Sequence, residues 1–315
     1  MKFSRQTTLG SQVTVTGVGV HSGMPASLTF GPADADAGYV FIRTGLDGAD
    51  REIRANAQSV IATEFATVLG DDSGPLISTT EHVLAALRGM GVDNATIEVD
   101  GPEAPIMDGS AAPFVAAIER AGVIQLRAAK RFIEVLKPVC VALGESFGEL
   151  RPYARGFRAE IEISFSNKSI GQQAYAFDLT PELFRRDICR ARTFGCMSDV
   201  AKLWSAGYAR GASFENSIVV DEGRVLNPDG LRYADEFVRH KALDAVGDLA
   251  LAGLPLLGLY RSSRGGHRLN NAVLRALMAD RGAWRIVESE IARRPRGAAD
   301  LVGAMAVPAF SPDVS

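Results

Sequence analysis

The sequence predicts an α+β protein made of two similar domains. The chain has 315 residues, which is longer than most single hydrophobic cores require. Short strand-like segments alternate with amphipathic helices in both halves, and each long helix carries a histidine near its start. Polar residues 128–131 interrupt this pattern. We therefore expect a first domain at residues 1–127 and a second at residues 132–293.

In the first half, residues 12–20, 26–30, 39–43 and 95–99 are rich in Val, Thr and Ile, which is typical of short strands. A helix is expected directly after residues 78–80, which are good N-cap residues, with Val83, Leu84 and Leu87 on its apolar face and Gly89 at its end. Gly122 is expected to end a second helix over residues 112–121.

In the second half, residues 131–143 and 156–166 alternate like strands. A long helix is expected at 237–252, followed by an apolar strand at 256–260. Residues 192–221 interrupt this order and are interpreted as an insertion, with Phe194, Met197, Val200, Leu203 and Trp204 at helical spacing. The tail at 294–315 is rich in Ala, Pro and Arg and is expected to be partly disordered.

Composition limits the possible partners and compartments. The net charge of -3 gives no general attraction to nucleic acid or to an anionic membrane. The longest apolar run, 249–260, is broken by Gly and Pro and is too short for membrane insertion. The N-terminus lacks the apolar stretch of a signal peptide, and three cysteines form neither a disulfide framework nor a CxxC pair. We expect a cytoplasmic protein whose metal ligands, if any, are histidines and carboxylates.

One helix face carries three residues suited to catalysis. His240, Asp244 and Asp248 recur every four residues and therefore share one stripe. Ala242, Val246 and Leu249 point to the other side, which suggests that the stripe faces a cleft. A solvated polar face is the alternative, but such faces usually mix Lys with Glu.

His240 and Asp244 can supply two ligands of a catalytic zinc, which needs a third ligand and an open position for water. His82 is the candidate third ligand. Glu81, directly beside it, is placed to act as general base. Glu81 also lies in the first turn of its helix, where an acid complements the helix dipole, and both roles are compatible.

His267 lies in a Gly-rich stretch after a strand and is a candidate proton donor. Asp248 could pair with its imidazole, raise its pKa and keep it charged. From spacing alone, these residues predict a His/His/Asp zinc hydrolase of unspecified substrate.

Six sequence blocks, in order, carry a resemblance to a known family: GVGVHSG (17–23), STTEH (78–82), PIMDGSAAPF (105–114), RARTFG (190–195), EFVRHKALDAVGDL (236–249) and GGHRLNN (265–271). Together they resemble the UDP-3-O-acyl-N-acetylglucosamine deacetylases, the zinc enzymes of the committed step of lipid A biosynthesis. The resemblance runs from about residue 4 to about residue 290.

The resemblance implies two domains, each with helices layered on a small sheet, and one Zn²⁺ at their interface. It implies that the zinc ligands are His82, His240 and Asp244. It assigns the general base to Glu81, and the general acid to His267 supported by Asp248. It further matches Thr193 to a hydroxyl that stabilises the oxyanion, and Lys241 to a lysine that contacts the substrate.

The resemblance also places a fatty-acyl passage in the second-domain insert, at Phe194, Met197, Val200 and Val219. Without it, an ordinary core stripe is the preferred interpretation of these residues. The chain departs from the family at Asn167 and Lys168, where a His-Pro pair is common, which affects loop contacts near the nucleotide. The first-domain insert at 59–70 has Glu64 and Phe65 at its tip, and His21 receives no role.

The implied function is hydrolysis of the N-acetyl group of an acylated UDP-sugar by a monomeric enzyme. Two alternatives stay open at this point. One is a zinc amidase acting on another N-acetylated sugar, which would not need the apolar insert. The other is a non-catalytic protein that binds acyl chains or nucleotides around a structural metal, in which Glu81, Asp248 and His267 would have no reason to converge.

Overall fold

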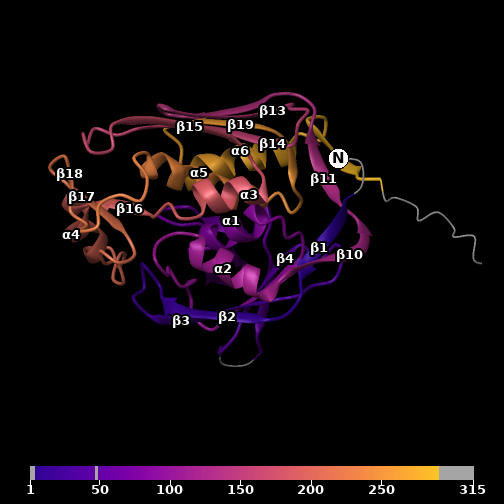
Figure 1. The fold of residues 1–315 in the computed structure, drawn as a ribbon, viewed down its shortest axis with the longest axis horizontal. Coiled ribbons are helices and arrows are strands. Elements are labelled where there is room, and N and C mark those ends of the chain that lie inside the picture. The colour runs from indigo at the N-terminus through magenta and orange to yellow at the C-terminus, as the bar shows by residue number, and fades with distance from the viewer. Residues whose placement is uncertain (1–3, 47–48, 291–315) are drawn as a thin grey trace, which may run out of the picture.

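The computed structural model describes residues 4–46 and 49–290, with its main helices packed between two sheets (Figure 1). A five-stranded sheet comes from the first half of the chain and a seven-stranded sheet from the second half. Each half contributes helices to the layer between them (Figure 1). The predicted α+β class, with helices layered on a sheet in each half, is therefore confirmed.

The first half agrees closely with the sequence prediction. Its sheet has the order β2-β3-β9-β4-β5. The strands are β2 (Val13–Val18), β3 (Pro25–Gly31), β4 (Tyr39–Arg43), β5 (Arg51–Arg54) and β9 (Ala95–Val99), and the helices are α1 (Glu81–Gly89) and α2 (Ala112–Ala121). Both helices and the strands at 39–43 and 95–99 have the predicted bounds.

Two small sheets complete this half. The turn η1 (Ala57–Ser59) leads into β6 (Val60–Ala62), β7 (Val68–Asp71) and β8 (Gly74–Ile77), which pair in that order and include the predicted insert. Strand β1 (Arg5–Leu9) pairs with β10 (Val123–Ala129), so the first strand of the chain lies beside the end of this half.

The second half is built on the larger sheet. Its main path is β12-β13-β19-β11-β20, and β14 pairs with both β15 and β19. The strands are β11 (Arg131–Val135), β12 (Val139–Leu143), β13 (Ser146–Arg151), β14 (Phe157–Ser164), β15 (Gln172–Asp178), β19 (Leu256–Ser263) and β20 (Trp284–Glu288). The strand predicted at 256–260 therefore continues for three more residues.

The remaining elements of the second half are helical or belong to the insertion. The short helix α3 (Pro181–Leu183) and the π-helix η2 (Phe184–Ile188) precede the insertion. The insertion contains β16 (Phe194–Cys196), α4 (Met197–Ser205), β17 (Ile218–Asp221) and β18 (Arg224–Val225), and it is followed by α5 (Glu236–Ala250) and α6 (His267–Ala279). Phe194 was predicted on the helix of the insertion, but it lies in a strand that pairs with Ile218.

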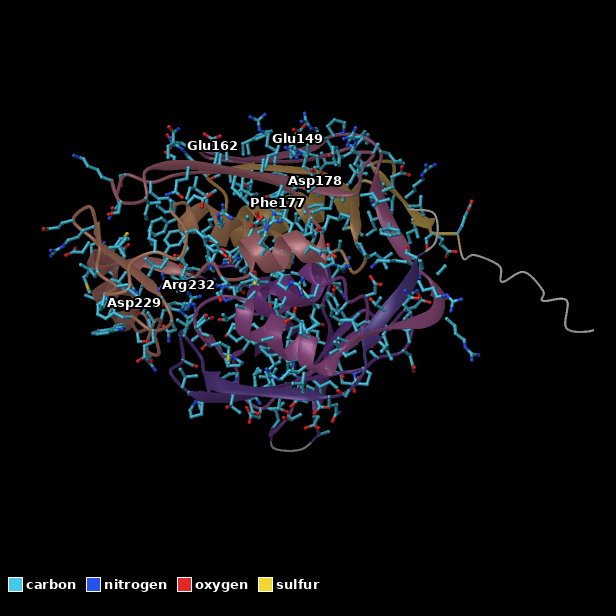
Figure 2. All side chains as sticks on the ribbon, in the orientation of Figure 1. Glu149, Glu162, Phe177, Asp178, Asp229 and Arg232 are labelled. Carbon is cyan, nitrogen blue, oxygen red and sulfur yellow. The ribbon has the colours of Figure 1, made fainter. Side chains whose placement is uncertain are left out.

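The large sheet separates a polar face from an apolar one. Glu149 and Glu162 project away from the helices, whereas Phe177 projects toward them (Figure 2). Along β14, Ala159, Ile161 and Ile163 are buried at every second position. This alternation is what an antiparallel or mixed sheet needs when one face contacts the core and the other contacts water.

The chain passes from one half to the other at Lys130, between β10 and β11. The predicted boundary at 128–131 falls in this passage, and we retain domains 1–127 and 132–293 as a proposal. The tail predicted at 294–315, and the last three residues of the second domain, lie outside the described residues. Among the described helices, none is long and apolar enough to cross a membrane.

The start of α1 differs from the N-cap prediction. Thr80 has helical backbone angles and its side chain makes no capping hydrogen bond. Instead, its hydroxyl donates to the carbonyl of Thr67, 3.1 Å away. A tertiary hydrogen bond has replaced the local cap. The end of α2 is as predicted, because Gly122 adopts φ 72°, which favours glycine.

Helices α1 and α5 cross at very close range. A Cβ added to Gly247 of α5 would lie only 2.0 Å from the carbonyl oxygen of Glu81 on α1. Both faces of α5 are consequently buried, including His240, Asp244 and Asp248 as well as Ala242 and Val246. The cleft predicted along the polar stripe is present at His240 and Asp244, which line a cavity, whereas Asp248 lies outside its lining.

We predict that Gly247→Ala destabilises the protein by about 1–3 kcal/mol, because the added methyl group forces the two backbones apart. In a free helix the same change would stabilise by roughly 0.5–1 kcal/mol, so the two effects have opposite signs. Urea unfolding measures the difference. Gly282→Ala is the control, since its Cβ would meet no atom closer than 3.4 Å. Unchanged stability in Gly247→Ala would contradict the close crossing.

Candidate metal centre and active site

Three buried side chains from both halves of the chain converge beside the helix crossing. His82 is the second residue of α1, and His240 and Asp244 are one turn apart on α5. One ligand atom from each lies within 4.8 Å of the others. The Nε2 atoms of His82 and His240 lie 3.7 and 3.4 Å from Oδ1 of Asp244. These distances are too long for good hydrogen bonds but suit three atoms around one cation.

The hydrogen-bond partners of these residues fit a metal site. Nδ1 of His240 lies 3.0 Å from the carbonyl of Ala191, and a proton on Nδ1 would leave Nε2 free to bind a metal. Within the part of the chain that the structure describes, Oδ1 of Asp244 is buried without a donor. Buried carboxylate oxygens normally have a partner, so two imidazoles and this oxygen form a donor set suited to zinc.

Burial and neighbouring charges keep the three candidate ligands in the deprotonated forms that metal binding requires. Burial lowers the pKa of His82 to about 3 and also lowers the pKa of His240, so both imidazoles are neutral at pH 7. Burial would raise the pKa of Asp244, but the positive charges of Lys241 and His267 outweigh burial and hold this pKa well below its usual range. All three groups therefore present lone pairs to a cation.

Lys241 neutralises the carboxylate from the side that faces away from the two imidazoles. Its Nζ donates to Oδ2 of Asp244 at 2.8 Å. Burial disfavours the charged amine, but Asp244 outweighs burial and raises the pKa of Lys241. The ammonium group also lies over the ring of Phe194, 5.6 Å from its centroid.

Glu81 and His267 form a second pair within the same site. Nε2 of His267 lies 3.7 Å from Oε1 of Glu81. Burial raises the pKa of Glu81 to about 7, against the opposing effect of His267. Burial alone would lower the pKa of His267, but Asp248 and Glu81 raise it to about 10. In such a pair, the carboxylate can accept one proton and the imidazolium can donate another.

Asp248 holds His267 in place without lining the cavity. Its Oδ2 accepts hydrogen bonds from Nδ1 of His267 at 2.9 Å and from Nδ2 of Asn270 at 2.7 Å. Its Oδ1 accepts from the hydroxyl of Thr67 at 2.6 Å. The carboxylate thus fixes the ring orientation of His267 and keeps a proton on its Nδ1.

A cavity of about 280 Å³ opens beside these groups. Of the residues predicted to contact substrate, Thr193, Lys241, Phe194, Val200 and Val219 line it, together with Glu81, His267 and the three candidate ligands. Met197 is not among the lining residues and is 39% exposed. The insertion therefore borders the site through β16, β17 and one side of α4.

The loop that carries Thr193 is held from both sides. The backbone N–H of Thr193 donates to the carbonyl of Gly109, and its carbonyl accepts from Ile218. The neighbouring Arg192 makes a buried ion pair with Glu236 at the start of α5, with Nε 2.9 Å from Oε1. Thr193 is therefore fixed relative to the helix that bears His240 and Asp244.

Aromatic residues from the two inserts meet at one end of the cavity. The rings of Phe65 and Tyr208 are 4.9 Å apart, and His21 packs against both. Nδ1 of His21 also accepts a hydrogen bond from the backbone of Ala209. His21 thus joins the two inserts. Asn167 and Lys168 lie outside the cavity lining, in the turn between β14 and β15.

One family of known proteins matches most of the chain. Residues 6–279 match the model of the family described as UDP-3-O-acyl N-acetylglycosamine deacetylase. The chain belongs to this family. The match spans every candidate ligand, the Glu81–His267 pair and both inserts.

Curated relatives in the deacetylase family are similar over most of their length. Proteins from Brucella ovis and Brucella canis, both named UDP-3-O-acyl-N-acetylglucosamine deacetylase, are 49% identical over 285 residues, which cover 90% of this chain and 99% of theirs. The protein of that name from Brucella melitensis is 48% identical with the same coverage.

Sequence reasoning missed several residues of this family member's site. The role of Thr67 could not be predicted, because nothing in the sequence indicates that the end of the first insert lies beside Asp248. Asn270 is three residues after His267 on the same helix face, and this spacing could have indicated a shared partner. Ile106, Cys196 and Leu203 also line the cavity.

We predict that His82→Ala, His240→Ala and Asp244→Ala each weaken metal binding, because each removes one of three donors. Glu81→Gln should retain the metal, since Glu81 is not a proposed ligand. Elemental analysis after dialysis measures the bound metal per chain. Loss of metal in Glu81→Gln with retention in His82→Ala would mean that base and ligand have been exchanged.

Proposed function

We propose that this protein is a zinc-dependent hydrolase that removes the N-acetyl group of UDP-3-O-acyl-N-acetylglucosamine in lipid A biosynthesis. Water and the amide would give acetate and the free amine. The proposal is supported by membership of the deacetylase family and by the names of relatives such as the Brucella ovis protein. The observation that carries it is the buried Glu81–His267 pair, 3.7 Å apart, beside a His/His/Asp donor set.

His82, His240 and Asp244 are the residues that would hold the zinc ion. When bound there, zinc would supply Lewis acidity and lower the pKa of a water molecule. The donor set suits this metal because it contains two neutral imidazoles and one ionised carboxylate, and because the described cysteines lie outside the group.

The chain's own residues divide the proton transfers between them. Glu81 accepts a proton from the attacking water, whose oxygen forms a bond to the acetyl carbon. The hydroxyl of Thr193 donates a hydrogen bond to the carbonyl oxygen as negative charge develops on it. His267, held charged by Asp248, protonates the departing nitrogen as the C–N bond breaks. Lys241 keeps Asp244 ionised and borders the substrate cavity.

The cavity wall formed by the insertion suits a fatty-acyl chain. Phe194, Val200 and Val219 present apolar side chains along it. Helix α4 has no fully buried residue, so its apolar side is available for a ligand rather than used in the core. We assign the 3-O-acyl chain to this wall, where each buried methylene contributes roughly 0.8 kcal/mol.

We further propose that the enzyme is a cytoplasmic monomer. One chain supplies the base, the acid and all three candidate ligands, so the site requires no second subunit. Its three cysteines are free, as is usual in a reducing compartment.

The function is tested by turnover of the acylated UDP-sugar in parallel with metal removal. Chelation is expected to abolish acetate release while circular dichroism stays unchanged, because the helices that carry the ligands are anchored by many residues of the hydrophobic core. Added zinc should restore activity. Full turnover by a metal-free sample would refute the zinc proposal, and equal turnover of a substrate lacking the acyl chain would favour another amidase.

We predict a bell-shaped dependence of kcat on pH. Activity requires ionised Glu81 and protonated His267, so it falls as pH drops through the pKa of Glu81 and as pH rises through that of His267. The pKa of Glu81 is about 7 without a metal, and a cation held by the candidate ligands would lower it and so move the acidic limb below pH 7. Glu81→Gln should lower kcat by roughly 10²-fold or more, and His267→Ala should remove the basic limb.

The two variants also serve as mutual controls, because each is expected to change a different limb while keeping its metal. Rate measurements across pH 5 to about 10, the range set by these groups, distinguish them. If His267→Ala leaves the basic limb intact, another group is the proton donor.

We predict that Val200→Asp raises the KM of the acylated substrate about 10-fold or more, because a charge replaces apolar contact with the chain. The KM of an analogue without the acyl chain should change little. Ala201→Asp is the matched control, since Ala201 is exposed on the same helix and does not line the cavity. Equal losses with both substrates would indicate that Val200 has only a packing role.

A further inference from the structure

Thr67 contacts both sides of the proposed acid–base pair. It lies directly before β7 in the first insert and is 1% exposed. Its backbone N–H donates to Oε2 of Glu81 at 3.0 Å, and its hydroxyl donates to Oδ1 of Asp248 at 2.6 Å. Its carbonyl accepts hydrogen bonds from the backbone N–H and the hydroxyl of Thr80. Every polar group of this residue is therefore used.

The two carboxylates that Thr67 joins come from different halves of the chain. Glu81 begins α1 and Asp248 lies near the end of α5. One oxygen of each carboxylate is taken by Thr67, while the other oxygen faces His267. Thr67 thus sets the position of Glu81 and Asp248 relative to the imidazole between them.

The hydroxyl has a specific effect on Asp248. Oδ2 of Asp248 is shared by His267 and Asn270, whereas within residues 4–46 and 49–290 the Thr67 hydroxyl is the donor to Oδ1. A carboxylate bound through both oxygens cannot rotate about its terminal bond without losing hydrogen bonds. Hydrogen bonds to an ionised acceptor are short and strong, and the 2.6 Å distance is of that kind.

We propose that Thr67 is a positioning residue for catalysis, which orients Asp248, and through it His267, by its hydroxyl and aligns Glu81 by its backbone N–H. This inference rests on the proposed function, because it needs Glu81 and His267 to act as base and acid. It gives the first insert a role in the chemistry in addition to bordering the cavity.

Thr67→Val tests the hydroxyl alone. Valine keeps the shape and the backbone N–H but leaves Oδ1 of Asp248 without its donor. We expect kcat to fall roughly 10- to 100-fold, because small misplacements of a proton donor have effects of this size. KM should stay within about twofold, since Thr67 does not line the cavity. Thr67→Ser keeps a hydroxyl and should restore most of kcat.

Thr8→Val is the matched control. Thr8 is also a buried threonine, 2% exposed, and its hydroxyl oxygen accepts a hydrogen bond from the backbone N–H of Ala33, between β3 and β4. The Thr8→Val variant loses a buried hydroxyl that contacts no proposed catalytic group, so its kcat should match that of the unmodified protein. Thermal unfolding of both variants shows whether each is folded, and Thr67→Ala replaces Thr67→Val if the latter is not.

A double-mutant cycle with His267→Ala separates positioning from general stability. If Thr67 acts through Asp248 and His267, Thr67→Val should have an effect of less than about twofold once His267 is absent. An equal loss of kcat in both backgrounds, or no loss in the single variant, would overturn the inference. The unmodified protein and His267→Ala report separately on the proposed function: if they hydrolyse the acylated UDP-sugar equally, the acid role fails and the role of Thr67 fails with it.

Discussion

The close crossing of α1 and α5 is the contact on which the rest of the site depends. Gly247 has no side chain, and this allows the backbone of α5 to approach the carbonyl of Glu81. At a normal helix separation, His82 on α1 would lie farther from Asp244 on α5, and Glu81 would lie farther from His267. Interhelical distance is usually set by the side chains at the contact, so one glycine determines the size of the candidate metal centre.

The crossing also concentrates ionisable groups whose side chains are almost wholly buried. Burial alone would neutralise these groups, and the arrangement of partners determines which of them stay charged. The charges of Lys241 and His267 keep Asp244 ionised, and Asp248 keeps His267 protonated. Glu81 lacks such a strong partner, and its pKa rises to about 7. Three neighbouring carboxylates are thus suited to different roles. Asp244 can bind a cation, Asp248 can orient the acid, and Glu81 can accept a proton.

The two inserts shape the cavity beside the candidate metal centre. The first insert supplies Thr67 and Phe65, and the second supplies Thr193, Phe194, Val200 and Val219. They meet where Phe65 packs on Tyr208. The helices and strands stabilise the fold, and the inserts attached to them can therefore shape the cavity.

The sequence by itself determined the local structure and the chemical types of the site. Hydrophobic periodicity and glycine positions predicted α1, α2, β4 and β9 with their bounds, because those signals are local. The four-residue spacing of His240, Asp244 and Asp248 placed them on one helix face, and the candidate ligands do lie together.

Only the tertiary structure decided how these residues meet. Periodicity identifies one apolar side of α5, but it cannot show that α1 buries the polar side as well. The Thr80 hydroxyl bonds to Thr67 rather than capping its helix, and Phe194 lies in a strand, because pairing with Ile218 outweighs helical spacing. The contact of Thr67 with Asp248 joins residues 181 positions apart. Such contacts depend on the packing of two sheets around one helix layer. Local sequence patterns cannot predict them, because they join residues that are far apart in the chain.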